Sequence, residues 1–373
     1  MMHTMKMAAP CLFGLESVLS GELKKIGAKN IEAFDGKVTY TGDWHMLAKT
    51  SLWLRTAERV LVVLDSFRAE TFEELFQGVL NIPFEEYLGK DDAFPVKGWS
   101  LNSQLASVPD CQSIIKRAVV KRMAGKYHQS WFSETGSLHQ IQFSIRKNIV
   151  TVCLDTSGAG LHKRGYRQTS LLAPIKETLA AGIADFTRLY DDSVLYDPFC
   201  GSGTLLIEAV LKGMNIAPGI NRRFAAEKWD CVPADVWKQA RSEALDLVKR
   251  DAKIRAYGYD IDPQAVELTL ANAKKAGVSA HIRAKVQDIS QFTTLPGRGI
   301  VVCNPPYGKR LLEIKEAEKL YQKMGEVFVP DRDKKYYIIS PHEEFEPIFG
   351  RTTDWRRKLY NGMIKCQLFM YFR

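Results

Sequence analysis

The chain of 373 residues, 46% of them hydrophobic, is long enough for two or three domains with real cores. No apolar run approaches the ~20 residues that span a bilayer, and residues 1–10 lack a signal-peptide pattern, so we expect a cytoplasmic protein with no membrane partner. The seven cysteines are scattered without a C-x-x-C pair, which argues against disulfides and a zinc site, and no metal is expected. A net charge of +9 permits a polyanionic partner, and the oligomeric state stays open.

Short strands and helices alternate over residues 1–65. The Asp35-Gly36 pair is a turn signal between two strands, and Gly27 ends a helix. In order, the sequence predicts a strand at 5–12, a helix at 16–26, strands at 30–34 and 37–40, a helix from Asp43 to Leu54, and a strand at 59–65. The order β-α-β-β-α-β is that of a ferredoxin-like domain.

Residues 66–157 form a second α+β region, with a strongly basic helix expected at 111–126. Around it we expect a helix at 72–79, an irregular or mixed stretch at 81–98, and strands at 99–105, 138–145 and 149–154. The cations of the basic helix that lie off its apolar stripe are Lys116, Arg117, Lys121 and Arg122. Such a face is often merely solvated. In a small module ahead of an enzyme domain, phosphate binding is the better interpretation.

A glycine-rich junction at 157–160 and a basic, aromatic connector at 161–167, which holds Arg164 and Arg167, lead to a third region. There the expected helices lie at 174–186, 203–212 and 263–275, and the strands at 193–197, 255–260, 281–286, 300–303 and 335–340, with a hairpin at 357–372. This α/β alternation predicts a doubly wound, mostly parallel sheet with an antiparallel edge.

The first strand of this region runs into Asp197-Pro198-Phe199-Cys200-Gly201-Ser202-Gly203-Thr204. Gly201 and Gly203 let the backbone approach a ligand at a helix N-terminus, where ligands of α/β sheets bind. The carboxylate of Asp197 would repel a pyrophosphate and attract a cationic cofactor. Leu206 stands where a dinucleotide-binding motif needs its third glycine, so NAD and ATP are disfavoured.

Two further acids follow the next strands. Asp260 could accept hydrogen bonds from ribose hydroxyls, although it lies 59 residues after Gly201 where ~20 is usual; the insertion at 213–253 accounts for the excess. Asp288 could accept from an adenine amino group. Either acid alone is more often a helix cap, but together they follow successive strands that end at one sheet edge.

The fourth strand ends in Asn304-Pro305-Pro306-Tyr307. The two prolines stiffen the chain and remove two donors, which leaves the Asn304 side-chain oxygen and the Pro305 carbonyl as acceptors beside an aromatic ring. These groups suit a planar base with an amino group, which the Tyr307 ring can stack on. Cys303 is expected to be buried packing.

The glycine turn and the Asn-Pro-Pro-Tyr tetrad resemble the two signature motifs of class I S-adenosylmethionine-dependent amino-methyltransferases. The stretches at 107–116, 161–167 and 173–180 make the chain similar to the THUMP-domain guanine-N2 methyltransferases of large-subunit (23S) ribosomal RNA. The resemblance implies a ferredoxin-like domain (1–65), a THUMP RNA-binding domain (66–157) and a Rossmann-like methyltransferase domain with a seven-stranded sheet (158–373).

The resemblance also implies S-adenosylmethionine as cofactor, RNA as partner and the following site residues. The cofactor would be held by Asp197, Phe199, Cys200, Gly201, Ser202, Gly203, Asp260, Ile261, Asp288 and Ile289, the target base by Asn304, Pro305, Pro306 and Tyr307, and RNA by Lys116, Arg117, Lys121, Arg122, Arg164 and Arg167. The tetrad does not distinguish guanine N2 from adenine N6 on RNA or DNA. A catalytically silent RNA-binding factor is the alternative from another class.

Overall fold

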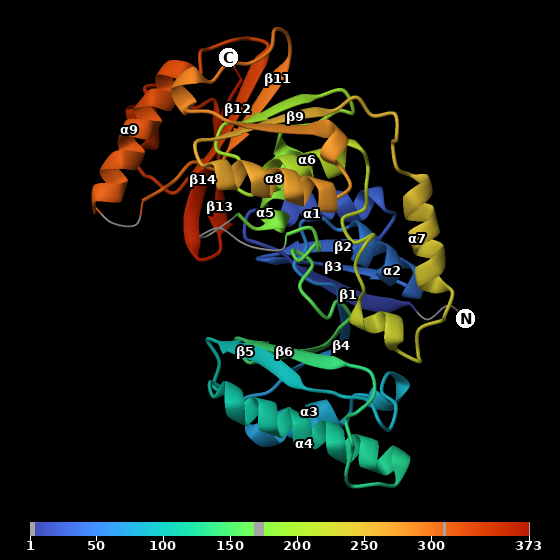
Figure 1. The fold of residues 1–373 in the computed structure, drawn as a ribbon. Helices are drawn as coiled ribbons and strands as arrows, with labels where there is room; N and C mark the ends of the chain where they lie inside the picture. The colour runs from blue at the N-terminus through green and yellow to red at the C-terminus, as the bar shows by residue number, and fades with distance from the viewer. Residues whose placement is uncertain (1–3, 168–174, 309–310, 373) are drawn as a thin grey trace.

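The computed structural model describes residues 4–167, 175–308 and 311–372, whose strands form two seven-stranded sheets (Figure 1). The N-terminal sheet has the order β2-β3-β1-β4-β7-β6-β5. Its elements are β1 (Met5–Pro10), α1 (Glu16–Lys25), β2 (Lys29–Phe34), β3 (Lys37–Gly42), α2 (Trp44–Trp53), β4 (Leu61–Arg68), α3 (Phe72–Leu80), β5 (Val96–Leu101), α4 (Val108–Tyr127), β6 (Gln140–Arg146) and β7 (Ile149–Asp155).

Strand β4 joins the two expected N-terminal regions. It pairs with β1 on one side and with β7 on the other, both antiparallel. The expected boundary after residue 65 therefore falls inside a strand, and the two regions share one sheet. We keep the division after residues 65 and 157 as a proposal about folding units.

Two expected helix starts in this part are confirmed, and several strands differ by a few residues from their expected bounds. The Asp43 side chain caps α2 by accepting from Met46 N at 2.9 Å. Thr71 and Glu74 form a capping box at the start of α3. The strand expected at 99–105 begins at Val96 and ends at Leu101, because β5 pairs along its whole length with β6.

The C-terminal sheet has the order β10-β9-β8-β11-β12-β14-β13, with parallel pairing up to β12 and an antiparallel β13–β14 hairpin. This confirms the predicted α/β fold. Its elements are α5 (Glu177–Phe186), β8 (Val194–Asp197), α6 (Thr204–Gly213), α7 (Val236–Asp246), β9 (Arg255–Asp260), α8 (Pro263–Lys275), β10 (Ile282–Val286), β11 (Gly299–Cys303), α9 (Leu311–Val327), β12 (Lys334–Ser340), α10 (Phe345–Phe349), β13 (Trp355–Asn361) and β14 (Ile364–Tyr371). Helix α9 was not among the elements expected from the sequence, and Pro174 lies outside the described residues.

Helices cover both faces of this sheet. Successive strand residues point to opposite faces, and on β8 Leu195 joins one hydrophobic cluster while Tyr196 joins another. The Leu195 cluster includes α5 and α6 and also takes in Leu15 and Val18 from the N-terminal part. The Tyr196 cluster includes α9 and α10. The sheet is therefore a buried layer, and a ligand can reach it only at its ends.

The insertion at 213–253 packs on the N-terminal part. Phe224, Trp229 and Trp237 belong to the same core cluster as the N-terminal strands. The Trp229 ring stacks on His139 with centroids 4.4 Å apart, and its Nε1 donates to the Leu138 carbonyl at 2.9 Å. Helix α7 accordingly lies beside α2 (Figure 1). The insertion therefore connects the C-terminal domain to the N-terminal part through packing contacts.

Candidate active site

The carboxyl ends of four neighbouring parallel strands, β10, β9, β8 and β11, meet at one edge of the C-terminal sheet. Pairing sets Val286 beside Asp260 and Asp197 beside Gly258, while Val301 lies beside Tyr196. The predicted residues Asp197, Asp260 and Asn304 consequently share this edge. A hollow of about 570 Å³ opens at the opposite edge, around Arg255 and His281, where no predicted site residue lies.

The glycine turn between β8 and α6 is held from behind by α8. Gly201 and Gly203 have φ of +52° and +76°, a region that favours glycine. The Thr269 hydroxyl donates to the Gly201 carbonyl at 2.9 Å, and the Asn272 amide donates to the Ser202 carbonyl at 2.9 Å. Thr269 and Asn272 were not singled out by the sequence analysis. The signal for them was two polar residues on the inner face of an amphipathic helix.

Asp260 links the turn to β9. One carboxylate oxygen accepts from Gly201 N at 2.9 Å and the other from Asp262 N at 3.1 Å. A carboxylate has about four acceptor positions. Each oxygen therefore keeps capacity for a further donor such as a hydroxyl group.

Asp197 is 1% exposed and accepts from Phe199 N at 3.0 Å. Burial, aided by the nearby negative charge of Asp260, raises the pKa of the Asp197 carboxyl well above its ordinary value. A buried acid of this kind is stabilised when a positive group lies against it. Burial favours its neutral form, and a positive group placed against it would favour the carboxylate instead.

The remaining predicted cofactor residues differ in exposure. Asp288 caps a short 3-10 turn, and hydrogen bonds from Ser290 lower its pKa. Ile261 is 69% exposed beside Asp260. Cys200, Ser202 and Ile289 are buried, and Phe199 is half-buried.

The tetrad after β11 is closed in this structure. The Tyr307 hydroxyl donates to the Asn304 side-chain oxygen, the acceptor that the sequence analysis expected to be free. The Tyr321 hydroxyl on α9 donates to the Pro306 carbonyl at 2.9 Å and fixes the turn. Burial raises the pKa of the Tyr307 hydroxyl, which lies beside Asn361 and Cys366 of the hairpin. Cys303 is fully buried, as expected for packing, and burial raises its pKa.

The four cations of α4 fall into two pairs. The Lys116 ammonium contacts the Glu134 carboxylate and lies 3.6 Å from the centre of the Phe94 ring. Arg122 forms an ion pair with Glu85. Arg117 and Lys121 are exposed, and their charged groups lie 5.2 and 5.7 Å from the centre of the Phe76 ring. Their exposure leaves both able to contact a phosphate.

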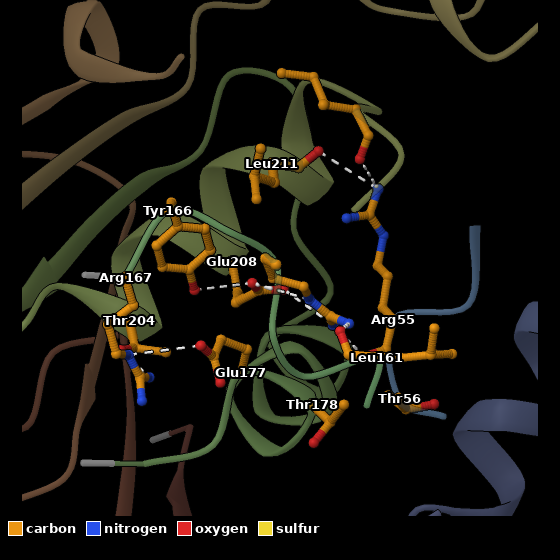
Figure 2. A network of polar contacts seen from close by, with 12 residues as sticks. Arg55, Thr56, Leu161, Tyr166, Arg167, Glu177, Thr178, Thr204, Glu208 and Leu211 are labelled. Atoms are coloured by element: carbon orange, nitrogen blue, oxygen red, sulfur yellow. Dashed lines mark hydrogen bonds and ion pairs between the residues drawn. The ribbon is translucent and has the colours of Figure 1, made fainter. Parts of the chain in front are cut away.

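The two connector arginines require a correction, because both have partners inside the protein. Arg164 lies between the N-terminal part and the C-terminal domain, whereas Arg167 contacts residues of the C-terminal domain, as Figure 2 shows for Glu177 and Thr204. Arg164 is 5% exposed; it donates to the backbone carbonyls of Leu161 and Arg55 and pairs with Glu208 at 3.4 Å. Arg167 donates to the Thr204 hydroxyl at 2.9 Å and lies 3.5 Å from Glu177. Buried charges need such partners, so Arg164 holds the two parts together and is not available to RNA.

Within the described residues, no helix is long and apolar enough to cross a membrane. The same residues contain no group of three or more His, Cys, Asp or Glu side chains arranged to hold a metal ion.

Comparisons with known proteins were made for the whole chain. Residues 164–369 match the family described as RMKL-like, methyltransferase domain, residues 6–61 match the RlmL ferredoxin-like domain, and residues 69–155 match the THUMP domain. YpsC of Bacillus subtilis, provisionally named an RNA methyltransferase, is 41% identical over 99% of this chain and 96% of its own length. The ribosomal RNA large subunit methyltransferase K/L of Psychromonas ingrahamii is 32% identical over 97% of this chain, which spans only 49% of that relative.

Two solved structures are also similar over nearly the whole chain. A predicted N6-adenine-specific DNA methylase of Listeria monocytogenes is 42% identical, with a TM-score of 0.94 over 99% of this chain and 96% of that one. SMU.472, provisionally named a methyltransferase and complexed with SAH, is 38% identical, with a TM-score of 0.94 over 100% and 99% of the two chains. This chain therefore belongs to the RMKL-like methyltransferases, which are S-adenosylmethionine-dependent enzymes, and carries a RlmL ferredoxin-like domain and a THUMP domain ahead of its catalytic domain.

Proposed function

We propose that this chain is an RNA methyltransferase that modifies the exocyclic amino nitrogen N2 of a guanine in large-subunit ribosomal RNA. The observation that carries the proposal is the alignment of a glycine turn, buried Asp197, Asp260 and the Asn304 tetrad along one sheet edge. The likeness to the ribosomal RNA methyltransferase K/L supports RNA as the substrate. The THUMP match, in a module that carries exposed Arg117 and Lys121, supports it further.

In this proposal the cofactor lies over the glycine turn. Asp260 accepts from its ribose hydroxyls, Asp288 from its adenine amino group, and buried Asp197 faces its cationic part. Exposed Ile261 covers the adenine ring, while the backbone of 199–203 and of Ile289 completes the site. When bound, the cofactor supplies an electrophilic methyl group on a sulfonium.

The acceptor nitrogen would be held by the tetrad. The lone pair of an aromatic amine is delocalised into the ring, so acceptors that draw its hydrogens out of plane make it a better nucleophile. Asn304 Oδ1 and the Pro305 carbonyl are suited to this, and the positive charge that develops on the nitrogen favours both oxygens. The Tyr307 hydroxyl must first leave the Asn304 oxygen, after which its ring can stack on the base, a contact worth ~1–3 kcal/mol.

Adenine N6 is the second candidate acceptor. Asn-Pro-Pro-Tyr suits either amine, and the similar Listeria structure is named as an N6-adenine-specific DNA methylase. The two substrates differ in which ring edge carries the amino group, so the product separates them directly.

The test is incubation with labelled S-adenosylmethionine and unmodified 23S ribosomal RNA, followed by nucleoside analysis. We expect label in N2-methylguanosine. Label in N6-methyladenosine, or in DNA offered in parallel, would replace guanine by adenine as the substrate. Failure to bind S-adenosylmethionine by calorimetry would instead favour a silent RNA-binding factor.

A further inference from the structure

The tip of the β13–β14 hairpin lies at the same sheet edge as the tetrad. Strand β14 runs antiparallel to β12, and Gln367 pairs with Ser340 at the carboxyl end of β12. Residues 361–364 precede that pair, so the tip projects past the edge by roughly 10 Å at ~3.3 Å per residue. Cys303, which pairs with Ile338, brings Asn304 to nearly the same level. Gly362, with φ of +64°, permits the tight turn.

The hairpin is one wall of the tetrad and is braced from behind. The Tyr307 hydroxyl lies beside Asn361 and Cys366. Arg357 on β13 donates to the Gly14 carbonyl at 3.0 Å and to the Ser17 hydroxyl at 2.9 Å. The tip is therefore held in place relative to the base-binding residues.

The tip of the hairpin exposes apolar side chains, and the two strands that lead to it carry exposed lysines. The Met363 side chain is 98% exposed and Ile364 is 38% exposed, at a turn where polar residues are usual. Lys358 and Lys365 on the two strands are exposed as well. A single exposed apolar residue is normal on a protein surface. Here its position is distinctive, because it stands beside the tetrad on a braced turn between two lysines.

We propose that Met363 enters the base stack of the RNA and fills the space that the target base leaves when it turns into the tetrad. This inference rests on the proposed function, since a base must leave its stack to be methylated. Apolar side chains, Met among them, serve as wedges between base steps, and the flexible Met side chain adapts to an irregular gap. Lys358 and Lys365 contact the flanking phosphates.

The first arm of the test compares two RNA hairpins built around the guanine identified in 23S ribosomal RNA, one with that guanine paired in the stem and one with it unpaired. For the paired hairpin we expect Met363→Ala to lower kcat/KM about tenfold or more and Met363→Leu to stay near wild type. On the unpaired hairpin Met363→Ala should match wild type, as should S-adenosylmethionine affinity by calorimetry. The control is Val329→Ala, which removes an apolar side chain that is 60% exposed, following α9.

The second arm measures base unstacking without methyl transfer. 2-Aminopurine is placed next to the guanine, and its fluorescence should rise when wild type with S-adenosylhomocysteine binds, but not with Met363→Ala. Wild-type kcat/KM of Met363→Ala on the paired hairpin, or no fluorescence rise with wild type, overturns the wedge while the proposed function stands. The proposed function fails separately, if wild type puts no label into guanine in the nucleoside analysis that precedes these two arms.

Discussion

Two groups of charged residues in the C-terminal domain were predicted to bind ligands: the acids at the sheet edge and the arginines of the connector. The structure gives the two groups different kinds of partner. At the sheet edge, Asp260 accepts hydrogen bonds from the backbone amides of Gly201 and Asp262 and keeps acceptor capacity for a ligand. In the connector, Arg164 donates to Glu208 and to the backbone carbonyls of Leu161 and Arg55. Charge type alone does not tell a ligand-binding residue from a structural one. The two kinds of residue differ in whether the hydrogen-bond and ion-pair partners of the charged group are already supplied by the protein.

The largest effect is expected on protein stability, when Arg164 of the connector is replaced. Arg164→Met removes the ion-pair partner of buried Glu208, which keeps the hydrogen bond from the Tyr166 hydroxyl. We expect a loss of about 3–5 kcal/mol of stability, read as a lower denaturation midpoint. Arg223→Met is the matched control, because the Arg223 side chain is 86% exposed and its ion pair with Glu227 is expected to contribute little. RNA affinity of the folded Arg164→Met protein should equal wild type. Unchanged stability with lost RNA affinity would return Arg164 to the RNA-binding surface.

At the sheet edge, Asn304→Ala should lower turnover by about 100-fold or more, because an oriented acceptor for the amine hydrogens is lost. Affinity for S-adenosylmethionine should persist, since Asn304 follows β11 whereas the glycine turn follows β8. Single-turnover methylation and calorimetry measure the two quantities separately. Wild-type turnover would remove Asn304 from the mechanism.

Asp260→Ala should weaken S-adenosylmethionine binding about tenfold, which corresponds to ~1.4 kcal/mol. The change removes the proposed ribose contact and the acceptor for Gly201 N. RNA binding should be unaffected, as measured by filter retention. An unchanged dissociation constant for the cofactor would assign Asp260 to the fold alone.

The same difference between exposed and internally paired charges is found among the cations of α4 in the THUMP domain. Arg117→Ala with Lys121→Ala should weaken RNA binding severalfold and reduce the slope of log affinity against log salt by about one per lost phosphate contact. Lys116→Ala should mainly affect stability, because its ammonium contacts Glu134 and Phe94. A larger salt-slope change from Lys116→Ala than from the double variant would reverse this assignment.

A pH-dependent effect concerns Glu22 of α1, whose carboxylate accepts from Arg55 N at 3.0 Å and from the Thr56 hydroxyl at 3.1 Å. Burial outweighs these hydrogen bonds and raises its pKa from 4.5 to about 7. The folded state then binds more protons than the unfolded state between these values, so stability falls as pH rises through that window and is level above it. Glu22→Gln should lack this decline in a denaturation series from pH 4.5 to 8. An identical decline in both proteins would contradict the assignment.

Much of the site could be predicted because strand order and strand direction place residues without reference to side-chain packing. Asp197, Asp260 and Asn304 each end a predicted strand, and parallel strands bring their ends to one edge. The features that could not be predicted depend on how side chains from separate elements pack together. The burial of Arg164 depends on Glu208, and the only signal was an acid inside the apolar run of α6. Closure of Asn304 by Tyr307, and the support from Tyr321 on the unexpected helix α9, depend on contacts between separate elements.

The insertion at 213–253 has a consequence for substrate choice. Its aromatic residues are part of the N-terminal core, so this packing fixes the N-terminal domains relative to the C-terminal domain. If RNA is held by the THUMP domain, only nucleotides at one fixed separation from that anchor can arrive at Asn304. The enzyme would then select its nucleotide by the three-dimensional form of the RNA, and two RNAs of unlike sequence but equal span would compete for it.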